Sequence, residues 1–114
     1  MWLLRIIISA LACVLPINHV GAAEIPKQGA AIYNGTCIAC HGADGTGSLP
    51  GVPDLNEKAG VLTKTDALLL RSLMNGVQGP NAPIAMPAKG GNPALTEDDM
   101  KAVLTYIRQN FQRK

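Results

Sequence analysis

Cys37, Cys40 and His41 form a Cys-x-x-Cys-His run, which carries the most specific chemistry in the sequence. Two thiols at this spacing can reach the two vinyl groups of one porphyrin, and the run is the signature of covalent haem attachment. The adjacent His is then held beneath the iron, where an imidazole nitrogen can bind as the proximal ligand. The run therefore predicts one covalently bound haem c, with iron chemistry that the polypeptide tunes.

A haem iron with His on one side has an open sixth position, for which Met is the usual ligand in electron transfer. Met74 and Met100 lie on apolar helical faces, where core packing accounts for them. Met86 instead stands in a Pro-rich loop, 45 residues after His41, which is enough chain to wrap around a porphyrin. Because loops on a rigid scaffold commonly carry ligating groups, we predict Met86 as the second axial ligand.

Two other chemistries also use Cys pairs. A zinc site needs four ligands, and beyond the two Cys and one His of the run the sequence offers no obvious fourth. A thiol–disulfide oxidoreductase carries Cys-x-x-Cys beside a βαβ unit, and the sequence has no alternating strand pattern. The sequence therefore favours haem over both.

Residues 1–23 have the composition of a secretory signal. An Arg near the start precedes an apolar run over residues 6–15, and small residues at 21–23 suit signal peptidase. The run is short and is interrupted by Pro16, which disfavours a membrane span. We predict a signal peptide cleaved before Glu24 and a periplasmic protein; an uncleaved membrane anchor is the alternative.

Residues 24–114 form the expected mature domain, with nine Lys and Arg against eight Asp and Glu. A domain of this size often needs a cofactor to complete its core. Its only aromatic residues are Tyr33, Tyr106 and Phe111, so a porphyrin would supply the large apolar body that the side chains lack. The sequence has no basic stripe with interleaved aromatic residues, so nothing in it indicates nucleic acid as a partner.

The hydrophobic periodicity predicts three main helices separated by two long Gly/Pro loops, 42–62 and 78–95. The first helix covers 27–36 and closes at the attachment run. The second starts at Thr63 or Thr65, ends at Asn75-Gly76, and has an apolar face of Leu70, Leu73, Met74 and Val77. The third is capped by Thr96, with an apolar face of Met100, Val103, Leu104, Ile107 and Phe111. The expected fold class is all-α.

Over residues 26–111 these features resemble the class I cytochromes c, of the short monohaem bacterial type. The spacing of Gly29, Tyr33 and Cys37 is similar to the N-terminal helix of that family, where the Gly and the aromatic meet the C-terminal helix. The matching positions on that helix are Val103 and Tyr106. Only Gly29 would let the two backbones approach closely.

The resemblance extends to the groups around the iron. In the family, a Pro near the spacing of Pro53 offers its carbonyl to the second imidazole nitrogen of the ligand His, here His41, which fixes the ring. Pro50 is the rival for this role. The segment from Met86 to Gly91 resembles the ligand loop of the family.

The resemblance implies a small cytochrome c fold wrapped around one haem, which shuttles one electron between periplasmic or membrane-bound redox partners. With both axial positions filled, a carrier is favoured over an enzyme. The alternatives are a haem subunit of a dehydrogenase or terminal oxidase complex, and a ligand sensor in which Met86 is displaced. We further hypothesise that Lys89 adds an orienting charge beside an apolar rim around the haem edge, made of Ile38, Ala39, Ile84, Ala85 and Pro87.

Overall fold

The computed structural model describes residues 15–17, 21 and 24–113. The expected signal peptide, 1–23, lies almost wholly outside the described residues, so its cleavage or retention stays a prediction. Among the residues that are described, no helix combines the length and the apolar character that crossing a membrane requires.

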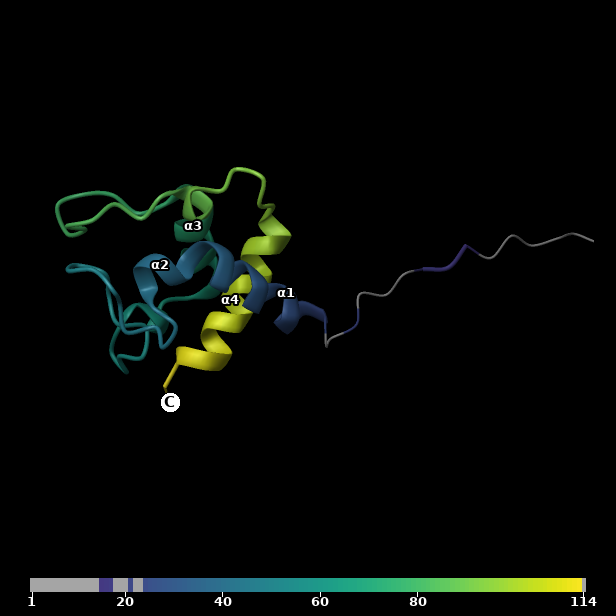
Figure 1. Ribbon diagram of the computed structural model, residues 1–114, viewed down its shortest axis with the longest axis horizontal. Coiled ribbons are helices and arrows are strands. Elements are labelled where there is room, and N and C mark those ends of the chain that lie inside the picture. The colour runs from purple at the N-terminus through teal and green to yellow at the C-terminus, as the bar shows by residue number, and fades with distance from the viewer. Residues whose placement is uncertain (1–14, 18–20, 22–23, 114) are drawn as a thin grey trace, which may run out of the picture.

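The described residues form no β-strand, only one isolated antiparallel bridge, and four α-helices (Figure 1). These are α1 (Glu24–Ile32), α2 (Ile38–His41), α3 (Asp66–Asn75) and α4 (Glu97–Phe111). A π-helical turn, Tyr33–Cys37, joins α1 to α2, so the chain runs as one helix from Glu24 to His41. Counted this way, the three predicted main helices and the all-α class are confirmed.

The first helix crosses α4 (Figure 1). Gly29 is buried at this contact, against Ala102 and Tyr106 of α4. A β-carbon on Gly29 would overlap the carbonyl oxygen of Ala102 and would lie 2.8 Å from Cβ of Tyr106. The predicted close approach is thus confirmed, with one correction: Ala102 takes the place expected for Val103. Adjacent helical residues point about 100° apart, so Val103 turns into the core, where it is fully buried.

The α4 helix begins as its sequence predicts. The Thr96 hydroxyl accepts a hydrogen bond from the Asp99 backbone N–H, and the Asp99 carboxylate accepts one from the Thr96 N–H, which completes a capping box. The other oxygen of the Asp99 carboxylate accepts a hydrogen bond of 2.6 Å from the Gln28 side chain, linking α4 to α1. The predicted apolar face is confirmed, because all its members are buried: Met100, Val103, Leu104, Ile107 and Phe111.

The α3 helix differs from its prediction in which face is buried. Leu69 and Leu73 are buried, whereas Leu70 is only partly buried against the core. The helix ends at Asn75, as predicted, so Val77 lies beyond it and is 38% exposed. The predicted i, i+3, i+4, i+7 face therefore extends two residues past the end of the helix.

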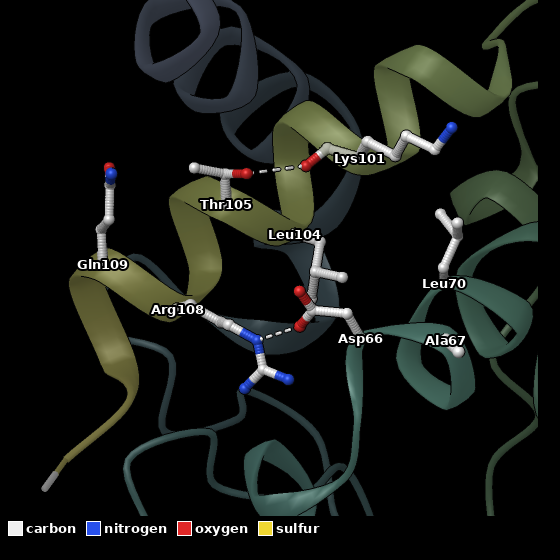
Figure 2. A pocket seen from close by; sticks show the side chains of 8 residues that line it. All are labelled: Asp66, Ala67, Leu70, Lys101, Leu104, Thr105, Arg108 and Gln109. Atoms are coloured by element: carbon white, nitrogen blue, oxygen red, sulfur yellow. Dashed lines mark hydrogen bonds and ion pairs between the residues drawn. The ribbon is translucent and has the colours of Figure 1, made fainter. Parts of the chain in front are cut away.

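Arg108 fastens the end of α4 to the segment before α3, a role that no local pattern indicates. Its guanidinium donates to the carbonyl oxygens of Leu62 at 2.8 Å and Lys64 at 2.7 Å, and to the carboxylate of Asp66. Figure 2 shows the Arg108–Asp66 pair at the edge of a groove between α3 and α4. These bonds hold the turn that precedes α3 against the C-terminal half of α4.

Tyr33 packs its ring against the other two aromatic residues of the expected mature domain. Its ring centroid lies 5.3 Å from that of Tyr106 and 5.2 Å from that of Phe111. Its hydroxyl donates a 2.6 Å hydrogen bond to the carbonyl oxygen of Gly42, directly after the attachment run. Burial raises the pKa of Tyr33 to about 12, with the nearby Cys37 adding to the shift.

We expect Gly29→Ala to lower the free energy of unfolding of the haem-loaded protein by about 2 kcal/mol, because overpacking typically costs 1–3 kcal/mol. Gly35→Ala is the matched control, since a β-carbon there meets no atom within 4 Å. It should leave stability unchanged or raise it by up to about 1 kcal/mol, the helix preference of Ala over Gly. Urea unfolding followed by far-ultraviolet circular dichroism measures both; equal losses would contradict the close crossing.

The raised pKa of Tyr33 predicts a loss of stability at alkaline pH. The ordinary pKa is 10.0 and the folded value is about 12, so this contribution is complete below pH 10 and disappears as the pH rises through 12. Tyr33→Phe should be about 1 kcal/mol less stable at neutral pH because it loses one hydrogen bond. It should, however, lose less stability than the parent between pH 10 and 12. Urea unfolding at several pH values tests this, and parallel pH profiles would refute it.

Candidate haem-binding cavity

A cavity of about 490 Å³ lies between the end of the first helix, α3, α4 and the two long loops. All five residues predicted from the sequence to hold the haem line this one cavity: Cys37, Cys40, His41, Pro53 and Met86. They come from three separate segments of the chain. The fold thus gathers the whole predicted donor set, although each residue's role at the iron stays a prediction.

The attachment run is positioned by the end of its helix and by the loop that follows. After α2 the chain turns back, and the N–H of Gly47 donates to the carbonyl oxygen of His41 at 2.8 Å. The N–H of Ser48 donates to the carbonyl oxygen of Cys40, also at 2.8 Å. These bonds satisfy carbonyls that a helix end leaves without partners, and so fix the loop against the run.

His41 has a buried Nδ1 atom without a hydrogen-bond partner in the described part of the chain. Burial lowers the pKa of His41, which favours the neutral ring that can bind a metal. A buried nitrogen without a hydrogen-bond partner costs free energy. It fits a ring that would bind iron through the other nitrogen, with Nδ1–H donating to a carbonyl oxygen. Pro53 lines the cavity with His41 whereas Pro50 does not, yet the Pro53 carbonyl makes no hydrogen bond to Nδ1 here.

Cys37 and Cys40 are partly buried, and neither forms a disulfide. Burial raises the pKa of Cys37 to about 11, and the nearby Cys40 adds to the shift. Thiol–disulfide oxidoreductases depend on the opposite, a thiol whose pKa is lowered so that the thiolate forms near neutral pH. The environment of Cys37 therefore opposes that rival chemistry.

Met86 is held at the cavity by its backbone. Val77 and Met86 exchange two N–H to carbonyl hydrogen bonds of 2.9 Å, which pin the loop to the end of α3. Gly76 permits this approach: its φ is 77°, and a β-carbon there would overlap the Met86 carbonyl oxygen. The sequence signals only that the helix stops near Gly76; the bridge itself has no local signature.

The other two Met residues behave as the sequence predicts. Met100 is 2% exposed in the core, and Met74 is partly buried against it. Neither lines the cavity, whereas Met86 does.

The structure places three of the five residues of the predicted apolar rim in the cavity lining, and the rim itself stays a prediction. Ile84, Ala85 and Pro87 line the cavity, but Ile38 packs partly buried against the core instead. Ala39 is exposed and also lies outside the lining. Because Cys37, Cys40 and His41 share the helix face that meets the cavity, the two residues between the thiols point elsewhere.

The remaining cavity wall is largely apolar, and the sequence does not predict it as part of the site. It consists mainly of aliphatic side chains from α3, α4 and the first long loop: Leu55, Val61, Leu62, Leu69, Leu73, Leu104 and Ile107. Lys64 is the one Lys, Arg, Asp or Glu among the residues that line this cavity. Two thiols, an imidazole, a thioether and aliphatic walls fit a haem c, which needs attachment points, axial ligands and an apolar surround.

Comparisons with known proteins agree with this geometry. Residues 26–111 match the cytochrome c family, which is most of the chain. The chain therefore belongs to the cytochrome c family, whose members hold haem c covalently and transfer electrons. It is 32% identical over 82 residues to cytochrome c-555 of Chlorobaculum thiosulfatiphilum, covering 69% of this chain and 88% of that protein.

Two further relatives are much longer than the match. The chain is 33% identical over 84 residues to lupanine 17-hydroxylase [cytochrome c] of a Pseudomonas species, covering 73% of this chain and 11% of that protein. It is 35% identical over 92 residues to the fructose dehydrogenase cytochrome subunit of Gluconobacter japonicus, covering 74% of this chain and 18% of that protein. The chain thus corresponds to a small part of each of these two proteins.

Proposed function

We propose that this chain is a one-electron carrier with a single haem c attached to Cys37 and Cys40 and ligated by His41 and Met86. The observation that carries the proposal is the convergence of these four side chains on one apolar cavity. When bound, the haem supplies an Fe(III)/Fe(II) couple, and the protein residues hold and tune it.

The chain's own residues favour a carrier over an enzyme or a sensor. Two backbone hydrogen bonds hold Met86 in place, so a ligand on this side would move little between oxidation states. The same bonds oppose displacement of the thioether by an external ligand, which a sensor requires. Aliphatic side chains of α3 and α4 would surround a bound haem with apolar groups, which favours the reduced form of the iron.

We further propose that the carrier is exported to the periplasm and exchanges electrons there with dehydrogenases or terminal oxidases. The composition of residues 1–23 supports export. A permanent subunit of a dehydrogenase complex is the second candidate, because one relative is named as the cytochrome subunit of fructose dehydrogenase. Purification of the chain at its natural level separates the two: a subunit brings a catalytic protein with it, and a free carrier does not.

Replacing the proposed thioether ligand tests the assignment. We expect Met86→Ala to lose the Met–iron absorption band and to become high-spin in the ferric state. Its reduction potential should fall by on the order of 0.1 V, within the range of about 0.8 V that axial ligands span. Absorption spectra of both oxidation states and a redox titration measure these changes.

Met74→Ala is the matched control, because Met74 lies outside the cavity. It should keep the Met–iron band and the potential, and lose only packing stability.

The intact mass of the purified protein should correspond to residues 24–114 plus one haem. A colourless protein from a host with haem-maturation enzymes, or a Met–iron band that persists in Met86→Ala, would overturn the ligand assignment.

A further inference from the structure

The segment that follows Met86 has an unusual backbone conformation. Lys89 has a φ of 53° and a ψ of 30°, and it is the one residue other than Gly with a positive φ in the part of the chain that the structure describes. Gly90 and Gly91 continue the left-handed turn, with φ of 63° and 84°. This conformation costs free energy for a residue with a β-carbon. Such outliers persist only where the surrounding structure holds them, and they cluster at ligand sites.

The left-handed turn brings Gly90 against the first helix. A β-carbon on Gly90 would overlap the Cγ2 methyl carbon of Thr36, whereas the next nearest atom, the Thr36 carbonyl oxygen, would lie at 3.4 Å. Gly90 and Thr36 both line the cavity. Gly is therefore required at this position for two reasons, the positive φ and the close approach to the Thr36 methyl.

Thr36 lies in an irregular segment of its own, the π-helical turn Tyr33–Cys37. The N–H of Ile38 donates to the carbonyl oxygen of Tyr33 across this turn. Single π-helical turns inside α-helices are rare, and they are frequent at functional sites. The contact between Thr36 and Gly90 thus joins two irregular segments, one beside the thiols and one beside Met86.

The chain from Gly90 back to Met86 is short and stiff. The N–H of Gly90 donates to the carbonyl oxygen of Pro87 at 3.1 Å, which closes a tight turn. The ring of Pro87 fixes its φ, here −69°, directly after Met86. On its other side, Met86 is bonded through its backbone to Val77. The segment is therefore held at both ends, at the end of α3 by hydrogen bonds and at the first helix by the contact with Thr36.

We propose that Thr36 is a positioning residue for Met86, and that its methyl group, by packing against Gly90, determines how firmly the thioether binds iron. The inference rests on the proposed function, because it takes Met86 as the axial ligand. Thr36 directly precedes Cys37 on the helix that also carries His41, so the contact places the Met86 segment relative to the helix that would hold the porphyrin. A β-branched side chain is stiff at χ1, so this methyl does not move aside easily.

Imidazole binding to the ferric, haem-loaded protein tests the proposal. Imidazole needs the iron position that Met86 would occupy, so its apparent affinity rises with the fraction of molecules in which the thioether has left the iron. An absorption titration that follows loss of the Met–iron band gives the dissociation constant. Met86→Ala sets the upper limit of affinity, because it has no thioether to displace.

Two substitutions separate the methyl of Thr36 from its hydroxyl. Thr36→Ser removes the methyl, and should bind imidazole about tenfold more tightly than the parent, the equivalent of about 1.4 kcal/mol. Thr36→Val is the matched control: it keeps the methyl and replaces the hydroxyl, and should stay within about threefold of the parent. A merely structural contact would lower the stability of Thr36→Ser to urea and leave its imidazole affinity unchanged.

Moving the methyl group to the other side of the contact is the second test. Gly90→Ala alone should overlap Thr36, displace the Met86 segment and raise the imidazole affinity by about tenfold or more. In the double variant Thr36→Ser/Gly90→Ala the added β-carbon takes the space that the lost methyl leaves, so the affinity should return to within about threefold of the parent.

Gly91→Ala is the control for the backbone conformation. It has the same cost of a positive φ as Gly90→Ala, but a β-carbon there approaches only Cγ of Pro87, at 3.9 Å. Its imidazole affinity should stay within about threefold of the parent. If Gly90→Ala does not retain haem, the comparison of Thr36→Ser with Thr36→Val decides alone.

Three results would overturn the positioning role of Thr36 while leaving Met86 as the ligand. These are equal imidazole affinities in Thr36→Ser and Thr36→Val, single effects that multiply in the double variant, and an effect of Gly91→Ala as large as that of Gly90→Ala. Failure of the ligand assignment is distinct, because imidazole would then bind the parent and Met86→Ala equally well.

Discussion

The crossing of the first helix and α4 at Gly29 is the constraint on which the cavity depends. Because the chain is helical from Glu24 to His41, fixing the backbone at Gly29 also fixes the direction of the attachment run, about 18 Å further along. The same α4 helix supplies Leu104 and Ile107 to the cavity wall. A shift at the crossing would therefore move two sides of the cavity relative to each other.

The two sides of the proposed iron site are held by different means. On one side, His41 follows from a continuous helix and a loop that folds back onto its end. On the other, Met86 lies in an irregular segment and is placed by the backbone bridge to Val77, which Gly76 makes sterically feasible. The helix and the hydrogen-bonded loop therefore position His41 and Met86 through hydrogen bonds that are independent of each other.

The residues that could be predicted from the sequence are those with a local signature. The attachment run, the Thr96 cap and the apolar face of α4 each follow from spacing within one segment, and the structure contains the cap and the face as predicted. The bridge from Val77 and the hydrogen bonds of Arg108 join segments far apart in the chain through backbone carbonyls, which any residue type provides. No side-chain pattern encodes such contacts. Among the apolar wall residues, Leu73, Leu104 and Ile107 are predicted from helix periodicity as apolar face, whereas Leu55, Val61, Leu62 and Leu69 have no signal in the sequence that places them at the site.

The size of the cavity ties the fold to its cofactor. The cavity of about 490 Å³ is open to solvent and walled largely by aliphatic side chains, so apolar surface faces water there, and a bound haem would bury it at a gain of about 25 cal/mol per Å². The three aromatic residues pack together beside Gly42 and Gly45, and none of them lines the cavity. The aromatic side chains therefore do not fill this space, and a bound haem would complete the apolar core as well as serve the proposed function.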